Sequence, residues 1–530
     1  MKSLNIASAS KDIITDLVID TMRLEKQALI FVNTKRSAEA TAEKVAKKTH
    51  INSKELEALA QNILSAATSP TKQCERLAKI VRMGHAFHHA GLISQQRTLI
   101  EDAFRKGLIK TISATPTLAA GVDTPAFRTI IRDTKRFSGA GMTDIPVLEY
   151  LQMCGRAGRP DYGDDYGEAI LIAKTQSQAQ QLTEKYVQGQ PEAIYSKVSA
   201  QPVLRTYCLS LAASEYVKTT DELIDFFNDT FFAHQYGDAK AIEKKLLTTV
   251  SQLREWGFLK SQQQAEHEDF ASADQFIADQ GQLQATPLGK RVSELYLDPL
   301  SAHELIDGMY KASTHKPPFF AWLHLLCCSA EMRPLLRIKN AEYEDIQQFL
   351  KENTKDLLIN EPSLYEPTYE QYLESVKTAQ MLHEWCEETS EEDILERYNV
   401  RPGELRARVS IADWLLYSAS ELARILKFHH HIAPINKTRT RLKYGAKQEL
   451  LALLKLKNIG RVRARKLYKN KIRTLQAIKD INAQTLADII GSKTAKSLKK
   501  QVGQDVNIKE TSPRKRKGQL SLNAKRFQQD

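Results

Sequence analysis

The fold of this 530-residue chain is decided by two short segments, ATPTLAAGVDTP at residues 114–125 and EYLQMCGRAGRP at residues 149–160. The stretch IKTI at 109–112, just before the first segment, predicts a buried strand, and Thr115 then lies where that strand gives way to a loop. Open α/β sheets bind phosphates at the carboxyl ends of their parallel strands. The first segment therefore predicts a phosphate-facing loop at the edge of a parallel sheet.

The second segment places two arginines, Arg156 and Arg159, three residues apart and each directly after a glycine. Arginines at this spacing share one face of a helix, and a planar guanidinium holds phosphate oxygens through two parallel hydrogen bonds. Such an arginine can also stabilise a γ-phosphate while it is transferred. The alternative is an exposed loop in which the two arginines pair with the acidic residues at 161, 164 and 165.

Together the two segments resemble motifs V and VI of superfamily 2 helicases, in the spelling of the Ski-like branch. Within that branch they are most similar to the archaeal HelQ-like DNA repair helicases. The resemblance implies an ATP-dependent motor that moves 3′ to 5′ on forked or branched DNA, with ATP and Mg²⁺ as cofactors. In such a motor Arg156 and Arg159 are catalytic, and Gln152, Gly121 and Asp123 line the ATP site.

The resemblance covers nearly the whole chain, but only the later part of the family's architecture. Helicases of this kind have two RecA-like lobes, and the first lobe supplies a Walker-type phosphate loop and an Asp-Glu pair. The sequence contains neither a Gly-Lys-Thr/Ser loop nor an Asp-Glu-x-His box. We therefore expect ATP and Mg²⁺ to be bound mainly by a partner polypeptide carrying the first lobe, unless the chain is a truncated product.

The composition of the chain limits the classes of binding partner and the cellular location that can be expected. No run of 18 apolar residues occurs, so we expect no membrane-spanning helix and no membrane partner. The six cysteines form no Cys-x-x-Cys pair, and no metal site is predicted. Residues 437–530 contain 26 Lys and Arg against 6 Asp and Glu, a net charge of +20, whereas residues 1–436 carry −8. A basic end on a mildly acidic body predicts a polyanionic partner, and thus a cytoplasmic, nucleoid-associated protein.

Residues 1–185 are predicted to form the α/β, RecA-like lobe with a parallel sheet. Apolar runs at 28–32 and 169–172 predict further strands, 94–107 a helix, and Ser37 is the expected N-cap of a helix over 38–47.

Three loops of this lobe are candidates for contact with the DNA backbone. By resemblance to the helicase motifs, contact is made by the Asn33–Thr34 loop, by His89 in the stretch FHHAGL at 87–92, and by Thr115. An ordinary strand–turn–helix at Asn33 and a buried structural turn at His89 are the alternatives.

A β-hairpin is predicted between the two deciding segments, where extended residues run into the glycine-rich turn at 138–141. In helicases that the chain resembles, a hairpin at this place separates the two strands of the duplex. Phe137 would then stack on the base at the fork. The alternative is a surface hairpin in which Phe137 is half-buried.

The remainder of the chain is predicted to be mostly α-helical. By resemblance it divides into a winged-helix domain at 186–285, a helical ratchet domain at 286–435, a helix-hairpin-helix domain at 436–505 and a disordered basic tail at 506–530.

A helix of the ratchet domain begins at Pro402 and carries the side chains expected to touch DNA. Arg406 and Arg408 would hold phosphates and Trp414 would stack on a base. A tryptophan in the protein core is the alternative for Trp414.

The helix-hairpin-helix prediction rests on two hydrophobic–glycine turns, at 459–460 and at 490–491, each followed by a helix. Helix N-termini bind phosphate without reading base sequence. The first unit is strongly basic, and its predicted DNA-binding residues are Arg461, Arg463, Arg465 and Lys466.

The predicted partners are single-stranded, forked or branched DNA, a first-lobe polypeptide, and a replication or repair protein that binds the C-terminal tail. The tail suggestion rests on QLSL at 519–522 with Phe527, which is similar to a sliding-clamp peptide. Two other functions stay open: a non-catalytic DNA-binding module, and an RNA helicase of the same branch. The helix-hairpin-helix units favour DNA over RNA.

Overall fold

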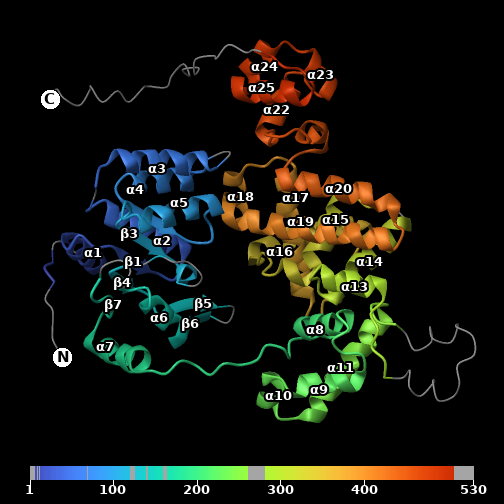
Figure 1. The fold of residues 1–530 in the computed structure, drawn as a ribbon, viewed down its shortest axis with the longest axis horizontal. Coiled ribbons are helices and arrows are strands. Elements are labelled where there is room, and N and C mark those ends of the chain that lie inside the picture. The colour runs from blue at the N-terminus through green and yellow to red at the C-terminus, as the bar shows by residue number, and fades with distance from the viewer. Residues whose placement is uncertain are drawn as a thin grey trace, which may run out of the picture. The chain divides into compact units, whose positions relative to one another are not determined.

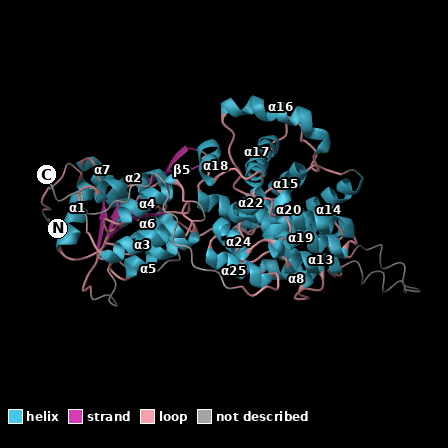
Figure 2. Ribbon diagram, turned by 90° about the horizontal axis from the view of Figure 1, so that it is seen from above, coloured by secondary structure: helices cyan, strands magenta, loops and turns pink. Residues whose placement is uncertain are grey.

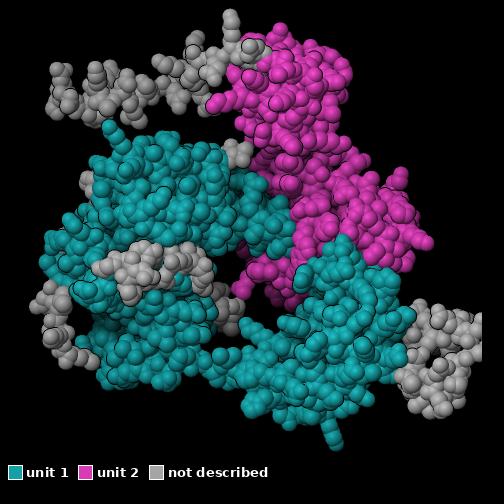
Figure 3. Space-filling view, viewed as in Figure 1, with its two compact units in different colours: residues 1–299, 390–411 teal, residues 300–389, 412–530 magenta. Residues whose placement is uncertain are grey.

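The computed structural model describes residues 6–8, 10, 12–49, 51–67, 70–119, 124, 126–138, 141–158, 164–260, 281–314 and 316–506. The chain divides into two compact units, coloured separately in Figure 3. The first unit comprises residues 1–299 and 390–411, and the second comprises residues 300–389 and 412–530.

The first unit contains a five-stranded, wholly parallel sheet with the order β2-β3-β1-β4-β7 (Figure 1). Its strands are β1 (Ala28–Phe31), β2 (His85–His88), β3 (Thr111–Ala114), β4 (Arg128–Ile131) and β7 (Glu168–Leu171). Every residue of β1 to β4 is buried, as expected for parallel strands covered on both faces. Ala114 lies beside both Phe31 and His88, and Ile131 also lies beside Phe31, so four strands end along one edge.

Seven helices surround this sheet among the described residues: α1 (Ile13–Arg23), α2 (Lys35–Ala46), α3 (Lys54–Ser65), α4 (Lys72–Val81), α5 (Ser94–Arg105), α6 (Val147–Cys154) and α7 (Gln176–Leu182). Their apolar sides and the strands form one core. The buried Arg128 fastens α1 to the sheet, because it donates to the Leu17 carbonyl at 2.9 Å and pairs with Glu168 of β7. The predicted α/β lobe with a parallel sheet is confirmed.

Two local predictions for this lobe were wrong. Helix α2 begins at Lys35, and its N-cap is Thr34 rather than Ser37, because the Thr34 hydroxyl accepts the Ser37 N–H at 3.0 Å. Strand β3 begins at Thr111, two residues later than predicted. Ile109 is buried, but its N–H bonds to the Ala103 carbonyl at 3.3 Å, which keeps it in the turn after α5.

The predicted β-hairpin is present as β5 (Lys135–Ser138) paired antiparallel with β6 (Gly141–Asp144). Its base is fixed by Tyr186, which lies in a π-helical turn after α7 (Thr183–Val187). The Tyr186 hydroxyl lies 3.0 Å from the Ile145 carbonyl, and its ring contacts Tyr150 of α6 at a centroid distance of 5.2 Å. Tyr186 therefore joins the hairpin to α6.

The rest of the first unit is helical where it is described, with α8 (Gln201–Ala213), α9 (Thr220–Asn228), α10 (Phe231–Tyr236), α11 (Ala239–Glu255), α13 (Pro287–Glu294) and α18 (Glu391–Tyr398). Isolated bridges join Leu259 to Ala285 and Thr219 to Gln282. The hairpin expected for a winged helix falls largely on residues 261–280, outside the described residues, so the winged-helix assignment stays a prediction.

The second unit is helical in its described part (Figure 2). It contains α14 (Pro299–Thr314), α15 (Phe319–Cys328), α16 (Tyr343–Asn353), α17 (Tyr369–Cys386), α20 (His429–Tyr444), α21 (Leu451–Leu454), α22 (Arg461–Lys469), α23 (Leu475–Asp480), α24 (Ala483–Ile490) and α25 (Ser492–Gln501). Helix α19 (Pro402–Ile425) is continuous from the first unit into the second. The helices from α21 onward share a core of their own, as expected for a helix-hairpin-helix domain. The predicted basic tail lies outside the described residues from 507 onward.

None of the helices described here combines the length and the apolar character that a bilayer crossing requires.

Candidate nucleic-acid interface

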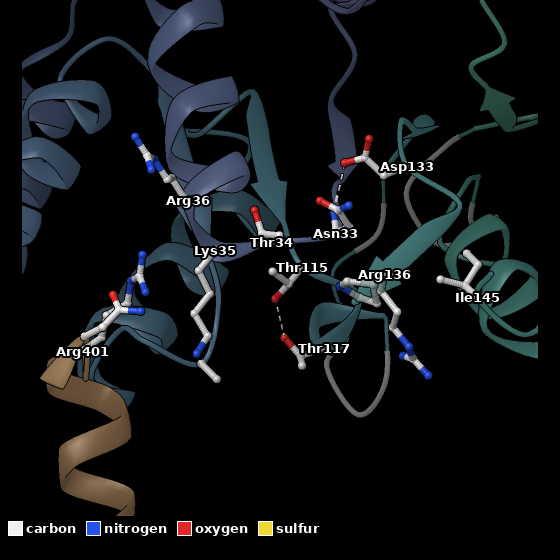
Figure 4. A pocket seen from close by; sticks show the side chains of 13 residues that line it. Asn33, Thr34, Lys35, Arg36, Thr115, Thr117, Asp133, Arg136, Ile145 and Arg401 are labelled. Atoms are coloured by element: carbon white, nitrogen blue, oxygen red, sulfur yellow. Dashed lines mark hydrogen bonds between the residues drawn. The ribbon is translucent and has the colours of Figure 1, made fainter. Parts of the chain in front are cut away.

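A cavity of about 600 Å³ opens at the sheet edge where β1 to β4 end (Figure 4). Among the described residues, four cationic side chains line it, Lys35, Arg36, Arg136 and Arg401, against the one carboxylate of Asp133. This charge balance suits an anionic ligand, and the position is where parallel sheets bind phosphates. In the view of Figure 4, Arg401 and Arg136 lie on opposite sides of the cavity, with Thr115 between them.

The loop after β1 supplies Asn33 and Thr34, which both line the cavity. Asn33 is held in place by the hairpin strand, since its Nδ2 donates to the Lys135 carbonyl at 2.9 Å. Thr34 accepts the Ser37 N–H as a helix cap, so its own hydroxyl hydrogen is left to donate to a ligand. The positive end of α2 begins here as well, which favours a bound anion.

The loop after β3 supplies Thr115 and Thr117, whose Oγ1 atoms lie 2.9 Å apart. The Thr115 N–H donates to the His88 carbonyl at 3.2 Å, which fixes the end of β3 against β2. Asn33, Thr34 and Thr115 were predicted separately as DNA-binding residues, and the fold brings all three to one cavity.

His89 does not fit the predicted contact with DNA. Its side chain is 0 % exposed and stacks on Phe87 with the rings 7° from parallel. Its Nδ1 accepts the Gly91 N–H at 3.1 Å, and its Nε2 lies 3.2 Å from Oε1 of Glu39. Burial lowers the pKa of His89, although Glu39 works in the opposite direction. The prediction was wrong because the ring is turned into the lobe, where it supports Glu39.

The two deciding segments of the sequence meet through Arg156. Its Nε donates to the Ala119 carbonyl at 3.0 Å, and the Ala126 N–H donates to the Arg156 carbonyl at 3.1 Å. The expectation that the arginines share a helical face was wrong, since α6 ends at Cys154 and Gly155 caps it. Gly158 then takes φ +65°, where an added Cβ would lie 2.6 Å from the backbone of Gly167.

Of the predicted ATP-binding residues, Gln152 is exposed near the end of α6. Gly121, Asp123 and Arg159 lie outside the described residues. The alternative in which the arginines pair with nearby acids does not hold for Asp164, whose ion pair in the structure is with Lys26 at 2.5 Å. Burial lowers the pKa of Arg156. Its guanidinium and the exposed amide of Gln152 are a donor set that fits phosphate oxygens.

The backbone of Phe137 pairs with Met142 in the hairpin, and its side chain lies outside what the structure describes. Neighbouring Arg136 pairs with Glu149 of α6 at 2.7 Å, which gives the hairpin a second link to that helix.

The predicted DNA-binding residues of α19 differ in their surroundings. Arg406 is exposed and pairs with Glu391 at 2.7 Å, whereas Arg408 is half-buried and donates to the Glu404 carbonyl at 3.5 Å. Trp414 is half-buried, beside Asp413, which pairs with Arg439 at 2.6 Å. Their contact with DNA stays a prediction.

The four residues of α22 that were predicted to bind DNA fall into two pairs. Arg461 covers the Trp385 ring at 4.1 Å and donates to the Thr389 carbonyl at 3.1 Å. Arg465 donates to Glu388 at 2.8 Å and also pairs with Glu449. Arg461 and Arg465 therefore attach the helix-hairpin-helix domain to the preceding helices of the second unit. Arg463 and Lys466, in contrast, are exposed.

Sequence reasoning missed Lys35, Arg36, Arg136 and Arg401 as residues of the cavity. The first three directly adjoin motif residues and could have been found there. Arg401 is more than 360 residues from Asn33 along the chain, and only the tertiary fold brings it to the cavity.

Three family models match parts of the chain. Residues 62–161 match the helicase conserved C-terminal domain, residues 320–445 match the archaeal helicase domain 4, and residues 450–503 match a SAM-like helix-hairpin-helix tandem. Each match falls on the architecture described above: the α/β lobe, the helical second unit and its C-terminal helices.

Curated relatives match over nearly the whole chain, and each is named ATP-dependent DNA helicase Hel308. The protein of Methanocella arvoryzae is 38 % identical over 95 % of this chain and 66 % of its own length. The protein of Pyrococcus abyssi is 37 % identical over 95 % of this chain and 67 % of its own length. The protein of Pyrobaculum calidifontis is 36 % identical over 95 % of this chain and 68 % of its own length. The chain thus spans about two thirds of these relatives. The expected similarity to HelQ is corrected, because these relatives are Hel308 proteins. The chain belongs to the Hel308 family of superfamily 2 helicases.

Proposed function

We propose that the chain is the DNA-tracking part of an ATP-dependent 3′–5′ DNA helicase that unwinds forked or branched DNA during repair. The observation that carries the proposal is the cationic cavity at the carboxyl ends of β1 to β4, lined by Asn33, Thr34 and Thr115. A single DNA strand laid across this edge presents its phosphates to hydroxyl, amide and cationic groups. Such contacts fix the strand without reading its sequence, as a motor requires.

The ATP site is proposed to be completed by a first RecA-like lobe. Arg156, Arg159, Gln152, Gly121 and Asp123 would face the nucleotide from this chain. Bound ATP with Mg²⁺ supplies the phosphoryl-transfer chemistry that drives movement. Arg156 supports the proposal because it links the loop after β3, which faces the DNA cavity, to the end of α6. A movement of the loop after β3 would therefore displace the end of α6, and the reverse.

Phe137 is proposed to separate the strands. Arg406, Arg408 and Trp414 would follow the single strand beyond the lobe, and Arg463 and Lys466 would add backbone contacts from the helix-hairpin-helix domain. That tandem module supports DNA rather than RNA as the substrate. A replication or repair protein is proposed to bind the C-terminal tail.

Reconstitution tests the proposal. The chain is mixed with the first lobe of a Hel308 relative, and ATP hydrolysis is measured with and without a 3′-tailed fork. We expect DNA-stimulated hydrolysis, and Arg156→Ala should lower it by a factor on the order of 10³, the usual effect of an arginine finger. Arg105→Ala, which removes an exposed α5 arginine paired with Asp102, is the matched control and should change nothing. If Arg156→Ala hydrolyses ATP as fast as the unsubstituted chain, the ATP-site assignment is wrong.

A further inference from the structure

The carboxylate of Glu39 is the centre of a buried cluster behind the DNA cavity. It lies in the middle of α2 with its side chain 4 % exposed. Gln73 and Arg76 of α4 donate to it, each at 2.8 Å, and His89 lies 3.2 Å away. Burial by itself would raise the pKa of Glu39, but the hydrogen bonds of His89 and Gln73 and the charge of Arg401 lower it to about 2. Glu39 is thus a fixed anion.

The fifth group of the cluster, Arg401, comes from the segment just before α19. Its Nε lies 3.3 Å from Oε1 of Glu39, and its side chain is 16 % exposed. Its backbone N–H donates to Glu404 at 3.0 Å. Within the described part of the chain, the two terminal nitrogens of its guanidinium have no hydrogen-bonding partner. Arg401 also lines the cavity that holds Asn33 and Thr115.

The segment that carries Arg401 is pressed against the α/β lobe. The Gly403 N–H donates to the Gly91 carbonyl at 3.0 Å. A Cβ on Gly403 would lie 2.3 Å from the Leu92 carbonyl oxygen, so only glycine permits this approach. Lys35 of α2 forms an ion pair with Glu404, in the first turn of α19. These contacts, with the pair to Glu39, hold Arg401 at a fixed place on the cavity wall.

We propose that Arg401 binds a backbone phosphate of the single strand in this cavity, and that Glu39 is its positioning residue. One edge of the guanidinium is held by Glu39, and the free edge presents two N–H donors to the ligand, as a fork suited to phosphate oxygens. The proposal rests on the proposed function, because it requires the strand to lie in the cavity. It gives the buried His89 a task as well: it supports the carboxylate that orients Arg401.

Binding of a short fluorescent oligothymidine strand tests the proposal. The full chain is used, with Arg463→Ala and Lys466→Ala as the common background, so that the cavity contributes more of the binding. Arg401→Ala should weaken binding about tenfold or more at low salt, and should lower the slope of log K against log salt by about 0.7, the value for one phosphate on a single strand. Arg401→Lys keeps the charge but loses the forked pair of donors, so its affinity should lie between that of the background chain and that of Arg401→Ala.

Arg105→Ala is the matched control, because Arg105 is an exposed arginine of the same lobe that pairs with Asp102 at 3.0 Å and does not line the cavity. It should leave the affinity and the salt slope unchanged. Glu39→Gln separates positioning from simple neutralisation. If Glu39 merely cancels the charge of Arg401, Glu39→Gln tightens binding, and the positioning role is overturned. If Glu39 positions Arg401, Glu39→Gln weakens binding, and combining it with Arg401→Ala adds little.

The outcomes distinguish this inference from the proposed function. If the chain binds no single strand even without the background substitutions, the proposed function fails. If it binds, and Asn33→Ala or Thr115→Ala weakens binding while Arg401→Ala does not, only the role of Arg401 is overturned. Thermal melting followed by circular dichroism confirms that each variant is folded before its affinity is compared.

Discussion

At the residue scale, the same side chain can serve both the fold and the ligand, and Thr34 is the clearest case. Its hydroxyl caps α2 by accepting the Ser37 N–H, while the residue also lines the cationic cavity at the sheet edge. A Thr-to-Ala change at a helix cap costs about 1 kcal/mol of stability.

Thr34→Ala should therefore lower the free energy of unfolding by about 1 kcal/mol, whereas Thr34→Ser, which keeps the cap, should leave it nearly unchanged. Urea titration followed by circular dichroism measures both. Equal stability of the alanine variant would show that water replaces the cap without loss.

A second residue-scale prediction concerns His324, which lies at the centre of the second unit. Burial lowers the pKa of His324 to about 3, and the ring is held by Ser375 at 3.0 Å. The folded state therefore keeps this histidine neutral, whereas the unfolded chain binds a proton below its ordinary pKa of about 6.5. Stability is fully present above pH 6.5 and is lost as the pH falls from there toward 3, by up to about 1.4 kcal/mol per pH unit.

His324→Gln, which cannot titrate, should flatten this pH dependence, even if it lowers stability at neutral pH. Urea unfolding between pH 7 and 5, followed by tryptophan fluorescence, reports on the correct unit, because Trp322, Trp385 and Trp414 belong to it. An unchanged slope in the variant would assign the pH dependence to other groups. Glu39, whose pKa is lowered to about 2, adds a loss of stability only below its ordinary value of about 4.5.

At the scale of elements, the π-helical turn after α7 determines how firmly the hairpin is held. The turn directs Tyr186, 1 % exposed, between β6 and α6, where its hydroxyl reaches the Ile145 carbonyl. Tyr186 thereby links the hairpin to the helix that leads to Arg156, beside the ion pair of Arg136 with Glu149.

Tyr186→Phe keeps the ring packing and removes only the hydrogen bond, so it should cost roughly 1 kcal/mol. Amide hydrogen exchange should become faster in β5 and β6. Tyr195→Phe is the matched control, since Tyr195 is 75 % exposed, and neither quantity should change. Unaltered exchange in the hairpin of the Tyr186→Phe chain would show that β5 and β6 are stable without this hydrogen bond.

At the scale of the whole molecule, the +20 charge of the C-terminal end is not all available to DNA. Arg461 and Arg465 are half-buried against protein partners, whereas Lys466 is exposed and Arg463, also exposed, donates to the Asn458 carbonyl at 3.0 Å. Two double variants with the same change in charge can therefore be compared directly.

Arg463→Ala with Lys466→Ala should lower the salt slope of single-strand binding by about 1.4, or 0.7 for each phosphate. Arg461→Ala with Arg465→Ala should leave that slope nearly unchanged and instead lower the melting temperature of the second unit. A salt titration with a fluorescent 3′-tailed duplex, paired with thermal melting, compares them. Equal slopes for the two double variants would show that all four residues reach the DNA.

Local sequence was sufficient for the class of fold and for the family. Buried apolar runs separated by amphipathic helices specify a parallel α/β lobe, because both patterns depend on neighbours only a few residues away. The Asn33–Thr34 and Thr115 loops follow strand ends, so their meeting at one edge was predictable from the rule that parallel strands end together. The hairpin was equally local, since it needs only two extended segments and a glycine-rich turn.

The tertiary structure alone decided which polar side chains face the ligand and which face the core. His89 follows a strand end, as Thr115 does, yet its ring is buried against Glu39, which lies fifty residues earlier in the sequence. Arg461 and Arg463 look equivalent in the sequence, but only Arg461 finds Trp385 beneath it. Arg401 lines the same cavity as Asn33, although more than 360 residues separate them in the sequence. Charge and hydrogen bonding act through space, and no local pattern records which distant partner will be within about 3 Å.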